Sequence, residues 1–504
     1  MVQEAFIGID IGTYGSKGVL LSAQGEVLAT AQREHGMETP RPGWAEQDAD
    51  AVWWADFCAI AQELMGTAQE RSVHIAAVAA SAIGPTCLPV DAAGRPLRPS
   101  ILYGIDTRAT AEIDHLNETL GAEAVLQATG NPLTAQAVGP KILWIRRNEP
   151  EVWRQTAHIL TAASYLTFRL TGRYVVDAYS AAPQAPLFSL DTLSWHPPFV
   201  EACCPIEMLP EIIWTTDFAG EVTPQAAAET GIPAGTPVTA GAIDAAAEAV
   251  SAGVTRPGDM MIMYGTTTFF IQPLDRRVQS PHLWGGVYMQ PGSYVLTGGM
   301  STTGAITQWF RRELAGGVEN AFDRLFAEAE GSPPGANGLL LLPYFSGERT
   351  PFSDPLARGV WAGLSLQTSR GDLFRSVLEA TALGVRHHVQ AMSDAGAPPQ
   401  RLVAVGGGTR SRLWLQMVSD ACNLPQDLPR QRIGASLGDA FLAAVAAGAL
   451  PNLEGIHDWI TLEEPVHPDP ATHALYAERF ELYRQLYEST VPVVHRLQGL
   501  GKGR

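Results

Sequence analysis

Apolar and polar positions at the start of the chain predict short strands joined by turns. The run AFIGIDIG is typical of a buried strand, and it ends in a turn of small and hydroxyl residues, TYGSK, at residues 13–17. GVLLSAQGEVLATAQREH then indicates two more strands around the turn AQG, which gives an antiparallel meander. A Walker phosphate loop would be followed by a helix, so this pattern excludes that motif.

Asp10 stands at the end of the first predicted strand, just before the small-residue turn. A carboxylate at this point is suited to a hard cation such as magnesium, and backbone N–H groups in the turn can hold a phosphate. The alternative is that Asp10 and the glycines beside it only form the turn. The first interpretation predicts an enzyme that acts on a nucleoside triphosphate.

A similar pattern occurs halfway along the chain. TPVTAGAIDAAAEAVSAGV runs from a strand through Gly241 and Asp244 into a helix of small residues, and GDMMIMYGTTTFFIQP follows as strand, turn and strand. We therefore predict an α/β fold with two lobes of similar design, residues 1–245 and 246–504, and a site in the cleft between them. The length of 504 residues is consistent with two domains.

Helical spacing of apolar residues predicts further helices in the second half. Asp372 is the expected N-cap of the helix LFRSVLEATALGVRHHVQAM. A strand, VAV, ends at glycines 406–408, where the lack of Cβ atoms lets the backbone lie against a flat ring or a phosphate. The small-residue cluster GASLG at residues 434–438 indicates close packing. Three other helices are expected, at residues 412–422, 437–447 and 471–497.

Composition and charge exclude several classes of protein. The chain has 34 basic and 52 acidic residues, and a net charge of −18 repels nucleic acids and anionic lipids. It has neither an apolar run of membrane-spanning length nor a signal-peptide pattern, so we expect a cytoplasmic protein. The five cysteines lack CxxC spacing, which argues against a zinc site. The expected partner is a small molecule, and the oligomeric state stays open, with a homodimer among the alternatives.

Several segments together resemble the FGGY family of carbohydrate kinases, within the actin-like ATPase superfamily. GPKILWIRRNEPE, around Lys141 and Trp144, resembles the first family signature, and GVWAGLSLQTSRGDLFRSVLE at residues 359–379 resembles the second. GWAEQDADAVWW near Trp44, GERTP at residues 347–351 and GGGTRSRLW follow the family in the expected order. The resemblance covers nearly the whole chain and implies two actin-like, ribonuclease H-like lobes.

The resemblance implies transfer of the γ-phosphoryl group of ATP to a sugar hydroxyl, with Mg²⁺ bridging the phosphates. Asp244 matches the family's catalytic base, which accepts the hydroxyl proton, and the alternative role for Asp244 is a helix N-cap. Asp10 would hold Mg²⁺, directly or through water. Thr267 as a turn hydroxyl and Arg412 as a solvated residue are also alternatives. The residues implied to bind ATP are Gly12, Thr13, Lys17, Gly265, Thr266, Thr267, Gly407, Gly408 and Arg412.

The implied sugar pocket departs from the pattern of the family's xylulose kinases. These typically carry Met-His-Gly where this chain has Ile83-Gly84-Pro85, Trp where it has Gly104, and Asn where it has Ala245. Asp106 and Arg108 match the family's Asp-x-Arg, and such a pair suits vicinal hydroxyls. We expect a roomier, less polar pocket that accepts a xylulose-like ketose or a related polyol, with D-xylulose a modest substrate.

Other acceptors, namely ribulose, erythritol, another polyol or an autoinducer-type sugar, are alternatives within the same class. A non-catalytic actin-fold ATPase is a second hypothesis, which Asp106, Arg108 and Asp244 disfavour because a nucleotide switch needs no acceptor pocket. A periplasmic sugar-binding protein also has two lobes and a cleft. The missing export signal and the two phosphate-type turns argue against it.

Overall fold

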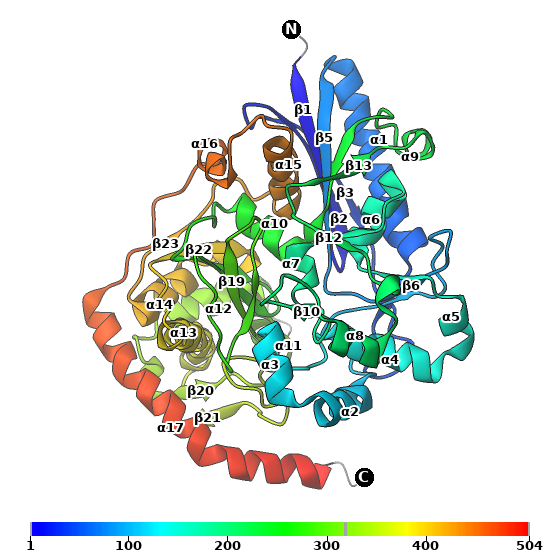
Figure 1. Ribbon diagram of the computed structural model, residues 1–504. Helices are drawn as coiled ribbons and strands as arrows, with labels where there is room; N and C mark the ends of the chain where they lie inside the picture. Colours follow the sequence, from blue (N-terminus) through cyan, green and yellow to red (C-terminus); the bar gives the residue numbers. More distant parts are fainter. Residues whose placement is uncertain (1–2, 317–319, 502–504) are drawn as a thin grey trace. The chain divides into compact units, whose positions relative to one another are not determined.

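The computed structural model describes residues 3–316 and 320–501 of the chain (Figure 1). The chain forms two compact units, each with its own β-sheet. The first unit comprises residues 1–256, 273–295 and 433–461, and the second comprises residues 257–272, 296–432 and 462–504. The prediction of two α/β domains is confirmed, and the boundary near residue 245 stays a prediction.

The main sheet of the first unit has the strand order β13-β14-β5-β1-β2-β3, and β15 also pairs with β5. β1, β2 and β3 form an antiparallel meander, as predicted, whereas β5 runs parallel to β1. The strands of this sheet are β1 (Glu4–Ile11), β2 (Gly15–Ser22), β3 (Val27–Glu34), β5 (His74–Ala82), β13 (Phe218–Glu221), β14 (Pro237–Thr239) and β15 (Ala242–Ile243). The remaining strands of the unit are β4 (Glu46–Gln47), β6 (Leu88–Val90), β7 (Ser100–Ile101), β8 (His158–Leu160), β9 (Val175–Asp177), β10 (Phe188–Ser189), β11 (Ser194–Trp195), β12 (Glu211–Ile213) and β18 (Trp284–Val287).

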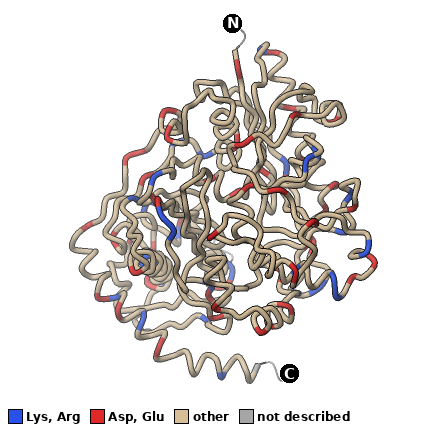
Figure 2. The backbone as a smooth tube through the Cα atoms, in the orientation of Figure 1, with Lys and Arg blue, Asp and Glu red and all other residues tan. Residues whose placement is uncertain are grey.

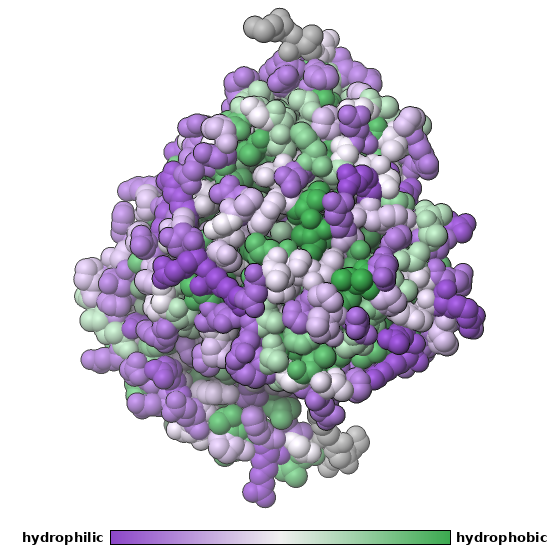
Figure 3. Space-filling model, viewed as in Figure 1, coloured by the Kyte–Doolittle hydropathy of each residue, from purple (hydrophilic) through white to green (hydrophobic). Residues whose placement is uncertain are grey.

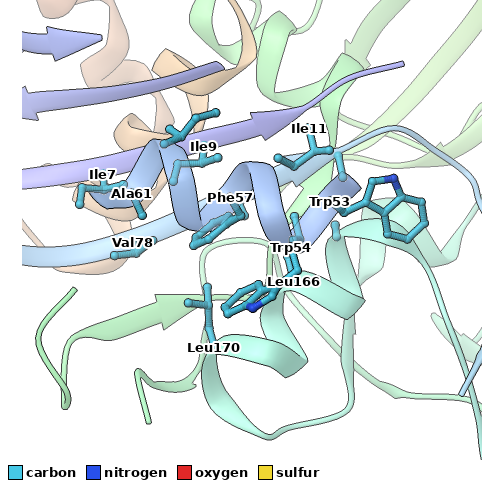
Figure 4. Close-up of a cluster of buried hydrophobic side chains, with 14 of the residues drawn as sticks. Ile7, Ile9, Ile11, Trp53, Trp54, Phe57, Ala61, Val78, Leu166 and Leu170 are labelled. Carbon is cyan, nitrogen blue, oxygen red and sulfur yellow. The ribbon is translucent and has the colours of Figure 1, made fainter. Parts of the chain in front are cut away.

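Helices cover both faces of the β1–β5 region. On one face, every second residue of β1, namely Ile7, Ile9 and Ile11, points toward helices α1 and α6. These side chains belong to the same buried cluster as Phe57 and Leu166 (Figure 4). All five of these side chains are fully buried. The helices of the unit are α1 (Ala55–Glu70), α2 (Thr110–Leu120), α3 (Ala122–Thr129), α4 (Val138–Asn148), α5 (Pro150–Gln155), α6 (Ala162–Thr171), α7 (Ala178–Ala181), α8 (Pro197–Cys203), α9 (Pro224–Thr230), α10 (Asp244–Ser251), α15 (Ala435–Ala446) and α16 (Ile456–Trp459).

Helix α15 packs against β1 at a distance that only glycine allows. A Cβ atom on Gly8 would overlap the carbonyl oxygen of Ser436 and the backbone nitrogen of Ala440. On another side of α15, a Cβ atom on Gly438 would overlap the carbonyl oxygen of Ala247 in α10. The small-residue cluster at 434–438 therefore marks close packing, as predicted, and it seats α15 against both β1 and α10.

The sheet of the second unit includes strands in the order β19-β17-β16-β22-β23. β16 and β17 are antiparallel around the predicted glycine and threonine turn, and β16 and β22 are parallel. The strands are β16 (Asp259–Tyr264), β17 (Thr268–Leu274), β19 (Tyr294–Met300), β20 (Leu340–Leu342), β21 (Val360–Ala362), β22 (Arg401–Gly406) and β23 (Gln426–Asp427). The helices are α11 (Gly304–Leu314), α12 (Ala321–Glu330), α13 (Arg370–Asp394), α14 (Arg412–Cys422) and α17 (Pro470–Gly501).

The expected N-cap of α13 is wrong by three residues. Ser369 caps the helix, and Asp372 lies three positions further on. The Asp372 N–H donates to Ser369 Oγ at 3.1 Å, and Asp372 Oδ2 accepts from the Ser369 N–H at 2.9 Å. This reciprocal capping box satisfies two backbone donors, which explains why an acidic residue stands inside the first turn.

The surface of the protein is mixed in character. Acidic and basic residues are interspersed along the chain (Figure 2), and the face seen in Figure 3 is largely hydrophilic with smaller apolar patches. Within the part of the chain that the structure describes, every helix is too short or too polar to cross a lipid bilayer.

The packing of α15 on β1 generates a prediction about two glycines of the first unit. Gly8→Ala should lower the free energy of unfolding by about 1 to 3 kcal/mol, because its methyl group would overlap backbone atoms of α15. Gly66→Ala is the control, since no atom lies within 4 Å of a Cβ atom there, and this change within α1 should add about 0.5 to 1 kcal/mol. Urea unfolding measures both. Equal stability of the Gly8→Ala variant and the parent would contradict the described packing.

Candidate active site

Asp10 and Ser81 are partners across the parallel strands β1 and β5, close to the carboxyl end of each strand. Ser81 Oγ lies 3.1 Å from Asp10 Oδ1 and 2.7 Å from Oδ2 of Asp439, which α15 contributes. Ser81 and Asp439 are buried, whereas Asp10 is partly exposed. The end of the β1–β5 pair thus carries two carboxylates joined by one hydroxyl group.

Asp244 reaches the same region from the other side of β5. Strand β15 pairs with the end of β5, where Ala242 is the partner of Ser81, and α10 begins at Asp244 directly afterwards. Asp244 is not the N-cap, because Ile243 holds that position. The Asp244 carboxylate accepts the N–H of Ala245 at 2.7 Å and is partly exposed. The carboxylate is therefore available to a molecule outside the helix.

The carboxylates of this region raise one another's pKa values. Burial raises the pKa of Asp10 well above its usual range, and the charge of Asp244 raises it further. Burial raises the pKa of Asp244 to about 7, with a further rise from Glu248, while the N–H of Ala245 lowers it. Burial and the charge of Asp10 likewise raise the pKa of Asp439. Such a cluster is stabilised by a bound cation.

Lys17 supplies positive charge near the cluster. It lies on β2 as the cross-strand partner of Asp10, it is exposed, and its charge lowers the pKa values of both Asp10 and Glu248. Over residues 3–316 and 320–501, the structure contains no group of three or more His, Cys, Asp or Glu side chains arranged to hold a metal ion. A cation here would therefore take its other ligands from water or from a substrate, which is how Mg²⁺ is usually bound.

The turn after Asp10 is held in place by residues that sequence reasoning missed. His35 Nε2 donates to the carbonyl of Gly12 at 2.9 Å, and its Nδ1 lies 2.8 Å from Asp56 Oδ2. Gln47 Nε2 donates to the carbonyl of Thr13 at 2.9 Å. His35 follows the end of β3, Gln47 lies on β4 and Asp56 lies on α1. The local sequence around Gly12 contains no sign of these partners. The turn is a supported loop whose Gly12 and Thr13 are only partly buried.

The expected sugar-binding pair Asp106 and Arg108 forms a buried ion-pair network. Arg108 donates to both carboxylate oxygens of Asp106 at 2.7 to 3.0 Å, and its Nη1 lies 2.6 Å from Glu46 Oε1. The guanidinium lies 3.9 Å from the ring centroid of Trp44 and 5.1 Å from that of Trp144. Both side chains of the pair are inaccessible to solvent. They hold family-like segments together, and their direct contact with a sugar stays a prediction.

The expectation of a roomier pocket is wrong at both glycine positions. A Cβ atom on Gly84 would lie 2.5 Å from Ile243 Cγ1, and one on Gly104 would lie 2.8 Å from Gln136 Oε1. Gln136 Oε1 also accepts the N–H of Gly104 at 2.6 Å. Neighbouring side chains occupy the space that the glycines leave. Gly84 lies next to Ile243, the residue before Asp244, and Ala245 is the residue after Asp244. Gly84 and Ala245 therefore both lie beside the expected base. Ile83 is buried.

In the second unit, the expected phosphate turn at residues 265–267 is exposed. The Gly265 N–H donates to the carbonyl of Thr267 at 3.0 Å, and the carbonyl of Thr266 accepts from the backbone N–H of Thr303 at 3.1 Å. The close approach of Gly304, at the start of α11, fixes the turn further, since a Cβ atom there would lie 2.5 Å from the Gly265 carbonyl. The turn is rigidly supported, with its residues open to solvent.

The expected adenosine segment follows β22, the parallel neighbour of β16. A Cβ atom on Gly408 would lie 2.8 Å from Tyr264 Cβ, so this glycine is required by packing. A Cβ atom on Gly407 would have no neighbour within 4 Å, so the backbone there is open to a ligand. Arg412 begins α14 and is exposed. Both expected nucleotide segments of this unit thus lie at the carboxyl ends of adjacent parallel strands, Tyr264 pairing with Gly406.

Two protein-family models together match most of the chain. The model of the FGGY family of carbohydrate kinases, N-terminal domain, matches residues 5–251, and the model of its C-terminal domain matches residues 260–447. The chain therefore belongs to the FGGY family of carbohydrate kinases.

Known members of the family resemble this chain over nearly its whole length. Xylulose kinase of Escherichia coli (strain K12) is 31% identical over 493 residues, which cover 97% of this chain and 100% of that protein. Gluconokinase of Bacillus subtilis (strain 168) is 26% identical, with 90% of each chain covered. The crystal structure of xylulose kinase from Rhodospirillum rubrum superposes with a TM-score of 0.92 at 35% identity, covering 97% of this chain and 100% of that one.

The raised pKa of Asp244 predicts a pH-dependent effect on stability. Its folded-state pKa of about 7 exceeds the value of about 3.9 in an unfolded chain, so the folded state binds more protons between these values. The contribution of this group to stability is present below pH 4 and is lost as the pH rises through 7. Asp244→Asn cannot ionise, so its Tm should exceed that of the parent at pH 8 by more than it does at pH 5.

Asp91→Asn is the matched control for this measurement. The N–H groups and charge of Arg95, with the N–H of Ala93, lower the pKa of Asp91, which is the opposite direction. This variant should gain nothing in Tm as the pH rises. A Tm difference for Asp244→Asn that is the same at both pH values would show that the folded-state pKa is not raised.

Proposed function

We propose that this protein transfers the γ-phosphoryl group of ATP to a hydroxyl group of a ketose or related polyol, with Asp244 as the general base. Membership of the FGGY family supports the carbohydrate kinase activity. The observation that carries the proposal for Asp244 is its position: a partly exposed carboxylate at the start of α10, one strand away from Asp10, with a pKa of about 7. Such a pKa suits a general base at neutral pH.

The residues present fit a magnesium ion. Asp10 Oδ1 is engaged by Ser81, while no described residue hydrogen-bonds to Asp10 Oδ2. Carboxylate oxygen is a preferred ligand of Mg²⁺, and a cation would offset the charges that now raise the pKa values of Asp10 and Asp244. Asp10 would hold the ion directly or through water. When bound, Mg²⁺ neutralises charge on the phosphates of ATP.

The chemical step assigns each group a task. Asp244 takes the proton of the acceptor hydroxyl while the oxygen of that hydroxyl forms a bond to the γ-phosphorus, and the bond from the γ-phosphorus to the bridging oxygen breaks to release ADP. In this proposal the turn at Gly12 and Thr13, with the ammonium group of Lys17, contacts the phosphates. The exposed turn at residues 265–267 and the open backbone at Gly407 are proposed to contact the nucleotide as well.

The acceptor is proposed from the environment of Asp244. Ile243 fills the space beside Gly84, so an apolar side chain stands where the family's xylulose kinases carry His. A hydroxyl that such a His would bind finds no partner there, at a cost of about 1 to 3 kcal/mol for each buried group left unpaired. We therefore infer a ketose or polyol other than D-xylulose as the preferred substrate.

Replacement of the proposed base generates a prediction about catalysis. Asp244→Asn should lower kcat by about 10²- to 10⁴-fold with little change in ADP affinity, because the carboxamide keeps the shape and loses the proton acceptor. A coupled ADP assay measures kcat, and calorimetry measures ADP binding. In the parent enzyme kcat/KM should fall below pH 7, and this acid limb should be absent from the residual activity of the variant. A kcat within threefold of the parent's would refute the assignment.

The environment of Gly84 generates a prediction about specificity. In a panel of ketopentoses, ketohexoses, tetritols, pentitols and gluconate, D-xylulose should have a kcat/KM at least about tenfold below that of the best substrate, which corresponds to one unpaired buried hydroxyl. Gluconate belongs in the panel because a gluconokinase is among the similar proteins. The highest kcat/KM for D-xylulose would show that the replaced positions do not govern the choice of acceptor.

A further inference from the structure

One carboxylate near the proposed metal site has no task in the reaction described so far. Asp439 lies in the first two turns of α15, and its side chain is buried. Its Oδ2 atom accepts both the backbone N–H of Ser81, at 3.2 Å, and the hydroxyl of Ser81, at 2.7 Å. Asp439 therefore accepts two hydrogen bonds from Ser81 and fixes the orientation of its hydroxyl group.

The fixed serine in turn contacts Asp10. Ser81 Oγ lies 3.1 Å from Asp10 Oδ1, so its single hydroxyl proton is shared between two carboxylates, with the shorter contact to Asp439. Asp10 has its other oxygen, Oδ2, free of hydrogen bonds from the described residues. The chain of contacts from Asp439 through Ser81 thus determines which oxygen of Asp10 faces the protein and which is available to a ligand.

The position of Asp439 is built into the fold. The glycine at position 8 lets the backbone of α15 lie directly on β1, and Asp439 Cβ is one of the atoms that a side chain at position 8 would meet, at 2.9 Å. A carboxylate so placed raises the charge density of the site and costs free energy of folding. Packing alone does not explain why a buried carboxylate stands at this position, whereas a role in orienting Asp10 does.

We propose that Asp439 is a positioning residue for the metal and phosphate end of the site. It fixes Ser81, Ser81 holds Oδ1 of Asp10, and Oδ2 of Asp10 is thereby left available to a metal ion. This rests on the proposed function only in assigning the metal to Asp10. Asp439 does not touch the ion, in keeping with the absence of a three-ligand cluster within residues 3–316 and 320–501. Partners of this kind change metal affinity by about 10- to 100-fold when they are removed.

The test measures metal binding without phosphoryl transfer. Mn²⁺ replaces Mg²⁺ as the probe, and electron paramagnetic resonance of free Mn²⁺ gives its Kd for the full-length protein saturated with ADP. Asp439→Ala and Ser81→Ala should each raise the Kd by about 10- to 100-fold. Asp439→Asn should stay within about threefold of the parent, because the carboxamide oxygen still accepts both donors of Ser81.

The double variant shows whether the two residues act as one unit. If Asp439 acts only through Ser81, the Kd of Ser81→Ala/Asp439→Ala should match that of the weaker single variant, since each change already breaks the same chain of contacts. Additive losses would overturn the proposal. So would an Asp439→Asn variant as weak as Asp439→Ala, because that result would make the charge of Asp439, rather than its hydrogen bonds, the quantity that matters.

Ser436→Ala is the control from the same helix. Ser436 is also buried, and its Oγ has no hydrogen-bond partner in the described part of the chain, so this variant should leave the Kd unchanged. A Kd for Asp439→Ala within twofold of the parent's would overturn the proposal. If that variant does not fold, Ser81→Ala gives the same readout with a smaller change. A protein that phosphorylates no sugar but shows the expected Kd values would refute the proposed function and leave this inference standing.

Discussion

The parallel pairing of β1 with β5 is the constraint on which the candidate active site depends. It sets Asp10 opposite Ser81, and the short strand β15, on the other side of β5, then delivers Asp244. Parallel strands end at the same edge of a sheet, so residues from distant parts of the chain meet there without any long loop. The same arrangement places like charges close together, and these charges contribute to the raised pKa values of Asp10 and Asp244. A bound cation would offset these negative charges.

Several of the segments that resemble the family's motifs meet in the interior of the first unit. Arg108 lies against Trp44 and Trp144 and pairs with Asp106 and Glu46, so three family-like segments meet in one buried network. Lys141, from the first signature, is also buried and bonded within the first unit. Its ammonium group donates to the carbonyl of Ala135 at 2.7 Å, and burial lowers its pKa to about 8.

Much of the fold could be predicted because its signals are local. The β1–β3 meander and the helix at Arg412–Cys422 follow from the spacing of apolar residues and turns. Asp244 was singled out because its segment, AGAIDAAA, resembles the one that carries the family's catalytic base. His35 and Asp439 were not found, since each acts on a residue far away in sequence. Gly104 led to the wrong expectation of extra space in the pocket for a related reason. The sequence does not reveal that Gln136, a distant residue, occupies the space beside this glycine.

The position of α15 on β1 also has a consequence for the order in which the protein is made. Asp439 and its partner Ser81 are separated by 358 positions, and the last segment of the first unit begins only at residue 433. At a synthesis rate of about 5 to 20 residues per second, the face of β1 at Gly8 waits about 20 to 85 s on the ribosome for the helix that covers it. During this interval the first unit is incomplete, although its earlier strands and helices have already left the ribosome. The serine contact with Asp439 is therefore one of the last parts of the candidate active site to form during biosynthesis.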